Sequence, residues 1–477
     1  MSKNFMLDTS GVVFLQLGAM AALAFYVAAN LGANDVANSM GTSVGSKALT
    51  LWQAIIVAGI LEFSGAVLFG QGVSETLATG VVNAEVFAAK PQVFLIGMVS
   101  VLIACGIWLQ IATSRGLPVS SSHAVVGAIA GFSCVAAGIN AVDWRTIGTI
   151  SLTWVATPIA SGALAALFYS GVKYWILDRP DPLFQLREWI PWLSAGMLSV
   201  FGIIVLPSVV DVALVQTGAI AFVYDRLGWN LPIHDIVIGI GSIGAIGLTL
   251  NSWKKLESVE KEEERRKKEE GRRKKEEGRS TNTNSPTLPL SPPPTLPPSE
   301  TPKLGHSLIE QQMARFQVLS ACFVAFSHGS NDVGNAVAPL AAIAYIRRTG
   351  SFPSDDFSVP LWILVVGGAG IVIGLAIWGK NVIATVGEKI IELQPSGGFC
   401  AELATATTVL LASRFGLPVS TSHALVGAVV GVGLIKAWKT VRWKTLLSIG
   451  SAWLVTIPIA AALGASIFSI AQWILAR

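Results

Sequence analysis

The chain has 477 residues, of which 52% are hydrophobic and 13% are charged, and its formal net charge is +4. Soluble domains carry about 25% charged residues, nearly twice this share. Twelve basic and nine acidic residues cluster within residues 254–279, which leaves 21 Lys and Arg and 20 Asp and Glu for the other 451 positions. So few charges cannot keep a soluble surface of that size hydrated. The composition therefore excludes a soluble protein and predicts that most of the surface faces lipid.

Apolar runs long enough to cross a bilayer, about 20 residues each, recur along the chain. They predict spans near 11–33, 51–70, 92–113, 146–172, 193–207, 209–224, 232–250, 314–345, 359–379, 396–413 and 445–474. Shorter runs rich in small residues follow Pro118 and Pro418, and we interpret these as re-entrant hairpins. We expect an all-α polytopic membrane protein with about 10–12 transmembrane helices. The four cysteines show no paired spacing, so no disulfide framework and no metal cofactor are expected.

Residues 251–308 form a predicted linker between a first transmembrane half, 1–250, and a second half, 309–477. Its first part, 254–279, alternates acidic and basic residues and could form a solvated helix through pairs three or four residues apart. A stretch rich in Pro, Ser and Thr follows to about residue 302 and cannot form a packed structure. We interpret the linker as a flexible connector rather than a regulatory tail. Its excess of basic residues favours the cytoplasmic side.

The two halves carry the same two motifs in the same order. Residues 30–38 read NLGANDVAN and residues 327–335 read SHGSNDVGN, an offset of 297 positions. Residues 116–127 read GLPVSSSHAVVG and residues 416–427 read GLPVSTSHALVG, an offset of 300. Duplicated halves are the usual architecture of secondary transporters, and the chain has no Walker A motif for ATP. The repeat therefore predicts a secondary active transporter.

The Asn-Asp motif has the residues of a cation site. Its asparagines lie four positions apart, so on a helix they form one stripe. A carboxylate inside the membrane costs about 3 kcal/mol by insertion scales, so it needs a cation, a proton or a polar cavity. The alternative is that these side chains only join helices by hydrogen bonds, but their duplication favours an ion site. The predicted Na⁺ ligands are Asn34, Asp35, Asn38, Asn331, Asp332 and Asn335.

The Pro-Val-Ser motif has the features of an anion site. Proline disfavours a helix at the preceding residue, and the hydroxyl cluster after it is typical of a helix N-terminus. Such an end binds phosphate-like anions through its N–H groups and its positive dipole. The predicted anion ligands are Ser120, Ser121, Ser122, Ser420, Thr421 and Ser422, together with Asp35 and Asp332. His123 and His423 follow directly, and either proton handling or orientation of the hairpin could explain them.

Two further acids, Glu62 and Glu402, lie inside apolar segments, where an acid is a functional candidate by default. Glu75 and Glu388 lie near predicted span ends and are expected at the membrane surface. A membrane-embedded hydrolase is the alternative from another class, but a triad activates one nucleophile and here the Ser-His pair occurs twice. A channel is a second alternative, although buried carboxylates in both halves suit stoichiometric ion coupling better.

At these motifs the sequence resembles the inorganic phosphate transporter (PiT) family of sodium- or proton-coupled phosphate permeases. The resemblance rests on residues 32–38 and 329–335 and on the paired LPVSxSH segments, and it covers roughly 15–250 and 310–474. The first motif reads Asn38-Ser39 where many members have Asn-Ala.

The resemblance implies two inverted-topology repeats, a homodimer and phosphate bound at the membrane midplane beside its coupling ions. It also implies that Glu62 and Glu402 are transport-critical. We expect a multi-pass protein of the cell membrane that imports phosphate by symport, with Na⁺ favoured over H⁺ because oxygen ligands outnumber titratable groups. A sulfate or other oxyanion permease remains the alternative within transport, and no nucleic-acid partner is expected.

Overall fold

The protein is described by a computed structural model that covers residues 2–115, 119–210, 233–280, 301–353, 357–386, 393–438 and 441–477. Within these ranges the chain is almost entirely helical, and the β-structure is limited to one isolated bridge between Val82 and Val142. The predicted all-α fold is therefore confirmed.

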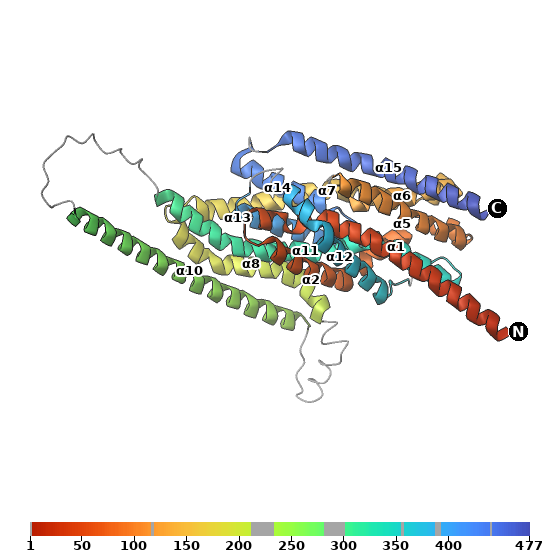
Figure 1. The fold of residues 1–477 in the computed structure, drawn as a ribbon, viewed down its shortest axis with the longest axis horizontal. Coiled ribbons are helices and arrows are strands. Elements are labelled where there is room, and N and C mark those ends of the chain that lie inside the picture. The colour runs from red at the N-terminus through yellow and green to blue at the C-terminus, as the bar shows by residue number, and fades with distance from the viewer. Residues whose placement is uncertain are drawn as a thin grey trace, which may run out of the picture. The chain divides into compact units, whose positions relative to one another are not determined.

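Figure 1 shows the helices, coloured in chain order. Up to the charged segment they are α1 (Ser2–Gly45), α2 (Leu51–Phe69), α3 (Gln71–Glu75), α4 (Ala84–Ala88), α5 (Pro91–Ser114), α6 (Ser121–Ala137), α7 (Trp144–Val172), α8 (Pro182–Val210) and α10 (Ile233–Ser280). They continue as α11 (Thr301–Thr349), α12 (Leu361–Val386), α13 (Pro395–Arg414), α14 (Thr421–Ala437) and α15 (Trp443–Leu475). Short π or 3₁₀ turns occupy Thr76–Gly80, Ile139–Ala141 and Lys173–Leu177.

Eight helices in the described ranges are long and apolar enough to cross a membrane, and each overlaps a predicted span. The predicted spans 314–345 and 396–413 are also helical, within α11 and α13. Their buried polar residues make them less apolar than the other eight. The predicted span 209–224 lies almost entirely outside the described residues. The short apolar helices α6 and α14 begin at the Ser-rich motifs, while their re-entrant path and the inverted orientation of the halves stay predictions.

The chain forms two compact units, each described here by itself. The first contains residues 1–172 and 313–477 and carries both copies of both motifs. The second contains residues 173–312, in which α8 packs against α10 through a 3.3 Å ion pair between Arg187 and Glu257. The charged part of the linker continues α10 as helix to Ser280, and residues 281–300 lie outside the described ranges.

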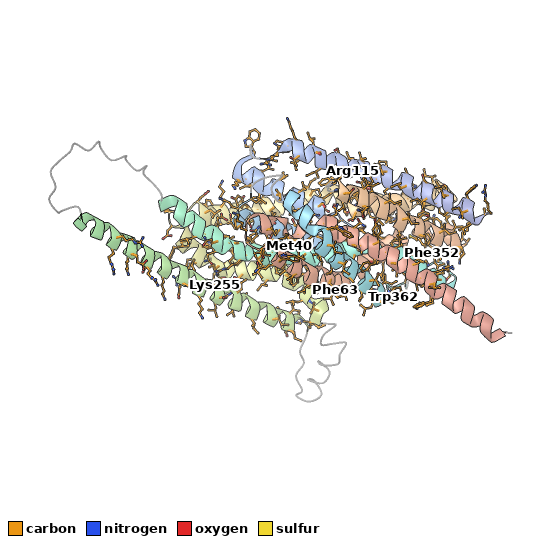
Figure 2. All side chains as sticks on the ribbon, in the orientation of Figure 1. Met40, Phe63, Arg115, Lys255, Phe352 and Trp362 are labelled. Carbon is orange, nitrogen blue, oxygen red and sulfur yellow. The ribbon has the colours of Figure 1, made fainter. Side chains whose placement is uncertain are left out.

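Helices from opposite halves pack against each other inside the first unit. In Figure 1, α1 lies beside α12 and α6 beside α15, and α14 packs on α7. Glycines make the backbones approach closely, because a Cβ on Gly32 would overlap the backbone of Ile371, and one on Gly131 would overlap that of Ala461. Met40 on α1, labelled in Figure 2, is fully buried in the hydrophobic core of this unit. The helices with the motifs are therefore fixed by partners from the other half.

This packing predicts that Gly131→Ala lowers the melting temperature of the detergent-solubilised protein. The added methyl group would overlap the carbonyl of Ala461, and overpacking of this kind costs about 1–3 kcal/mol. Gly148→Ala is the matched control, because no atom lies within 4 Å of its Cβ position and alanine stabilises an open helix position by roughly 0.5–1 kcal/mol. Equal melting temperatures for the two variants would contradict the close packing of α6 on α15.

Candidate functional site

The two Asn-Asp motifs lie within continuous helices, the first in α1 and the second in α11. All six predicted cation ligands are buried, and none is more than 6% exposed. Polar side chains buried to this degree need partners, because each unpaired group costs roughly 1–3 kcal/mol. Most of these partners come from the Ser-rich motifs.

The Asn-Asp motif of the first half contacts the Ser-rich motif of the second half. Asn38 Nδ2 donates to Ser422 Oγ at 2.8 Å and to Asp35 Oδ1 at 2.9 Å. Ser422 Oγ also donates to Asp35 Oδ1 at 3.4 Å. The contact joins residues that are 384 positions apart in the sequence. Two predicted cation ligands and the first turn of α14 thus belong to one cluster.

The Asn-Asp motif of the second half makes the reciprocal contact. Asn335 Nδ2 donates to Ser121 Oγ at 3.0 Å, to Ser122 Oγ at 3.2 Å and to Asp332 Oδ1 at 3.3 Å. Asp332 Oδ2 accepts a further hydrogen bond from Thr421 Oγ1 at 2.9 Å. The last asparagine of each Asn-Asp motif therefore contacts hydroxyl groups of the opposite half, whereas Thr421 belongs to the same half as Asp332.

The middle asparagine of each motif stays within its own half. Asn34 Nδ2 donates to Thr113 Oγ1 at 3.2 Å, and Asn331 Nδ2 donates to Ser413 Oγ at 3.0 Å. Thr113 and Ser413 are equivalent positions near the ends of α5 and α13. These bonds hold each Asn-Asp motif against the helix that leads into its own Ser-rich motif.

The Ser-rich motifs form the N-termini of α6 and α14, as predicted. The N-cap Ser120 accepts from the amide of His123 at 3.4 Å, and the N-cap Ser420 accepts from the amide of His423 at 3.3 Å. The two ends adjoin, since Ser122 Oγ donates to the carbonyl of Val419 at 2.9 Å. Helix N-termini offer unpaired N–H groups and a positive dipole end. Two such ends meeting at buried hydroxyl groups can hold an oxyanion.

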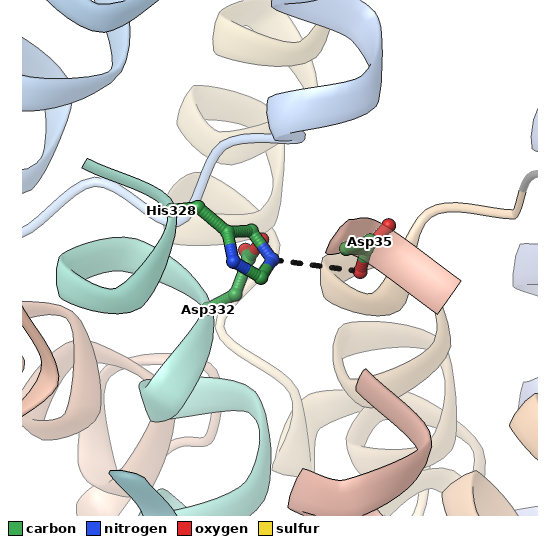
Figure 3. Close-up of side chains that lie close together, drawn as sticks. All are labelled: Asp35, His328 and Asp332. Atoms are coloured by element: carbon green, nitrogen blue, oxygen red, sulfur yellow. Dashed lines mark ion pairs between the residues drawn. The ribbon is translucent and has the colours of Figure 1, made fainter. Parts of the chain in front are cut away.

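His328 on α11 lies between three carboxylates and was not singled out by the sequence. Its Nε2 lies 2.9 Å from Asp332 Oδ2 and 3.8 Å from Asp35 Oδ2, and its Nδ1 lies 3.2 Å from Glu62 Oε2. Figure 3 shows the ring between the carboxylate of α1 and that of α11. Ligand atoms of Asp35, His328 and Asp332 all lie within 4.8 Å of one another, close enough to share one ion. The sequence did contain a signal for this residue. His328 lies four positions before Asp332, which places both side chains on one face of a helix.

The charges of this cluster do not balance. Among the ion pairs of the described residues, Asp35, Glu62 and Asp332 pair with His328 and with no lysine or arginine. If the three acids are ionised, even a protonated imidazole leaves a net charge of about −2, and buried charge of that kind must be compensated. The cluster therefore has the charge to hold cations.

A buried oxygen of Asn335, one of the predicted Na⁺ ligands, is free to contact a cation. Asn335 Oδ1 has no hydrogen-bond partner among the described residues, whereas its Nδ2 makes the three bonds given above. An unpaired buried carbonyl oxygen beside a carboxylate is the kind of hard ligand that Na⁺ and similar ions prefer. The fit of this part of the site to a cation is therefore good.

Glu402 forms a second polar cluster at the crossing of α1, α11 and α13. It accepts hydrogen bonds from the hydroxyl groups of Thr42, Ser43 and Ser320, and from Gln317 Nε2 at 3.4 Å. The position equivalent to Glu402 in the first half is Leu102, by the offset of 300. The sequence predicted the acid but none of its four partners. The cluster joins α1 of the first half to α11 and α13 of the second, and Leu102 provides no second copy of the acid.

The other acids with an expected position have simpler surroundings. Glu75 lies at the end of α3 and is partly exposed, and it accepts a hydrogen bond from Gln71 Nε2 at 2.8 Å. Glu388 lies outside the described residues.

The helices and their buried, duplicated motifs define a polytopic membrane transporter. The sequence profile of the phosphate transporter family matches residues 31–464, and the chain belongs to this family. It is 37% identical over 463 residues to inorganic phosphate transporter 2-1, chloroplastic, of Arabidopsis thaliana, covering 95% of this chain and 71% of that protein. A solved structure described as the sodium-dependent phosphate transporter matches with a TM-score of 0.74 and 33% identity, covering 96% of this chain and 99% of the other. A hydrolase is therefore excluded.

The geometry predicts that His328→Leu destabilises the protein. Removing one partner of a buried charge cluster costs about 3–5 kcal/mol, because the carboxylates of Glu62 and Asp332 lose the group beside them. The melting temperature in detergent without Na⁺ should fall, and the double variant His328→Leu/Glu62→Leu should recover part of the loss. His234→Leu is the control, since the side chain of His234 is 74% exposed. A single variant that melts with the wild type would show that His328 does not hold the carboxylates.

Proposed function

We propose that this protein imports inorganic phosphate by symport with Na⁺. Phosphate is held between the N-termini of α6 and α14, and the cations are held by the two Asn-Asp motifs. The reciprocal hydrogen bonds between these motifs carry the proposal, because Asn38 contacts Ser422 while Asn335 contacts Ser121. Cation ligands and anion-binding helix ends are joined in one buried cluster, as symport requires.

The anion part of the proposal rests on what a helix N-terminus can offer. Ser120 and Ser420 cap their own helices, so Ser121, Ser122, Thr421 and Ser422 remain as hydroxyl ligands. Their hydroxyl groups now bond to Asn335, Asp332 and Asn38 and would turn toward a bound phosphate. The resemblance to phosphate permeases gives the identity of the anion.

The cation part rests on charge. Import of HPO₄²⁻ against a potential of 100 mV costs roughly 4.6 kcal/mol, at about 2.3 per charge. Two Na⁺ ions offset that charge, and a third makes import electrogenic and driven by the potential. Asp35 and Asp332 lie where such ions would bridge the carboxylates and the phosphate.

Glu402 offers a further position for a coupling ion. It is fully buried, and all of its hydrogen-bond donors are neutral. A carboxylate without a cationic partner in such surroundings takes up either a metal cation or a proton. Na⁺ coupling and H⁺ coupling therefore predict different occupants beside Glu402.

The carboxylates also supply selectivity for phosphate. A carboxylate can accept a hydrogen bond from protonated phosphate, whereas sulfate has no proton to donate and is repelled. From the resemblance to the family, we further propose a homodimer in the cell membrane. The excess of basic residues in the linker supports a cytoplasmic position for it.

The direct test is uptake of radiolabelled phosphate into proteoliposomes with Na⁺ and pH gradients imposed separately. We expect an inward Na⁺ gradient to drive accumulation and a pH gradient alone to drive little. Excess unlabelled sulfate should leave uptake unchanged. Accumulation under the pH gradient alone would replace Na⁺ by H⁺ as the coupling ion, and strong inhibition by sulfate would favour an oxyanion permease of broader range.

The selectivity argument predicts that Asp332→Asn lowers phosphate uptake and relaxes the preference for phosphate over sulfate. The amide keeps the size of the side chain but removes its charge, and loss of one charged ligand should reduce uptake at least about tenfold. Glu85→Gln is the matched control, because Glu85 is an exposed acid remote in sequence from both motifs. Uptake of both anions that equals the wild type in Asp332→Asn would refute this role of the carboxylate.

A further inference from the structure

His123 and His423 form a buried pair that lies directly behind the hydroxyl clusters. Their rings meet edge to face with centroids 4.8 Å apart, and each residue is 4% exposed. The ring of His123 packs at a tilt against Trp154 of its own half with centroids 3.9 Å apart, and that of His423 packs at a tilt against Trp453 of its own half with centroids 3.6 Å apart. Four rings thus pack together between α6, α7, α14 and α15.

Each imidazole is bonded to the backbone of the opposite half. His123 Nδ1 lies 3.2 Å from the carbonyl oxygen of Trp453, and His423 Nδ1 lies 3.2 Å from that of Trp154. A carbonyl oxygen can only accept, so Nδ1 carries the hydrogen in both rings. The tautomer is therefore fixed by these contacts.

A proline explains why one of these two carbonyl groups needs an external donor. Pro158 has no amide hydrogen for the carbonyl of Trp154 four residues earlier, and His423 supplies the missing hydrogen bond. Pro458 lies five residues after Trp453, so the amide hydrogen that it lacks would serve the carbonyl of Leu454. His123 bonds the neighbouring carbonyl, that of Trp453, beside this break in α15. The indole of Trp154 adds a bond from Nε1 to the carbonyl of Pro418 at 3.2 Å.

The outer nitrogens of the pair do not suit proton transfer. Nε2 of His123 and Nε2 of His423 are buried without a hydrogen-bond partner among the described residues. A proton on either would place an unpaired charge among apolar rings, next to a second imidazole, which is costly. The geometry therefore favours orientation over proton handling.

The hydrogen bonds of His123 and His423 lie where they fix the orientation of the proposed anion ligands. His123 and His423 are each the residue after the hydroxyl cluster, in the first turn of α6 and of α14. Close glycine contacts hold the same helix pairs together, since a Cβ on Gly127 would overlap Ile457 of α15 and one on Gly427 would overlap Pro158 of α7. The hydrogen bond from the first turn of each helix also prevents that helix from rotating about its own axis against its partner.

We propose that His123 and His423 are positioning residues. Through Nδ1–H bonds to the carbonyl groups of Trp453 and Trp154, they lock the N-termini of α6 and α14 to the proline-interrupted helices of the opposite half. This inference rests on the proposed function, because the helix ends that it positions are the proposed phosphate ligands.

The test exchanges each histidine for a side chain that keeps only one of its two nitrogens. Asparagine carries its amide nitrogen on Cγ, as histidine carries Nδ1, whereas glutamine places its amide nitrogen near Nε2. Loss of one hydrogen bond is worth roughly a factor of ten. In Na⁺-driven uptake we expect His123→Asn and His423→Asn to keep the apparent KM for phosphate within about twofold of the wild type. The corresponding Gln variants should raise it at least about tenfold, and the exposed His234→Gln should leave it unchanged.

The melting temperature in detergent provides a readout that does not depend on transport. It should follow the same order, with the Asn variants near the wild type and the Gln variants lower. Gln variants that match or exceed the Asn variants would identify Nε2 as the working atom and overturn the proposal, as would four variants with equal KM and equal melting temperature. If the wild type shows no Na⁺-dependent phosphate uptake, the proposed function fails, and the order of melting temperatures still decides the positioning role.

Discussion

The structure depends on one constraint, which is the burial of acidic groups where water cannot reach them. Asp35, Glu62 and Asp332 meet at the crossing of α1, α2 and α11, with one imidazole among them. An isolated carboxylate in apolar surroundings is so unfavourable that it must be paired, hydrogen-bonded or neutralised. The hydroxyl and amide groups around these acids, which would be unusual in an ordinary membrane helix, are explained by this requirement.

Both halves supply partners to the acids, and the contacts of Asp35 with Ser422 and His328 cross between the halves. The contact with Ser422 links the two kinds of proposed ligand. Ser422 bonds to Asn38 and Asp35 while it occupies the first turn of α14. In the proposed function, an anion that draws this hydroxyl away from Asp35 leaves the carboxylate in need of a cation. Binding of either ion then favours the other, which is the reciprocal coupling that linkage requires.

Much of the fold was predictable because apolar runs and helix breaks are local properties. The positions of Asp35, Asp332 and the Ser-rich helix starts were also predictable, since duplication marks them. The pairing of each Asn-Asp motif with the Ser-rich motif of the other half was not predictable. The two Ser-rich motifs are nearly identical, so the sequence does not indicate whether Asn38 contacts Ser122 or Ser422. His328 and the partners of Glu402 escaped prediction for a related reason. Leu31 occupies the position equivalent to His328, and Met20 and Leu23 occupy the positions equivalent to Gln317 and Ser320. The repeat that marks the other residues therefore does not mark these.

The separation of 384 positions between Asn38 and Ser422 has a consequence for biosynthesis. During synthesis α1 enters the bilayer long before α14 has been translated. Asp35 and Asn38 therefore lack their native hydroxyl partner while most of the chain is made. Protons or water must satisfy them during that interval. The nascent first half is therefore a vulnerable intermediate, and truncation anywhere before α14 leaves buried polar groups that quality-control proteases of the membrane can recognise.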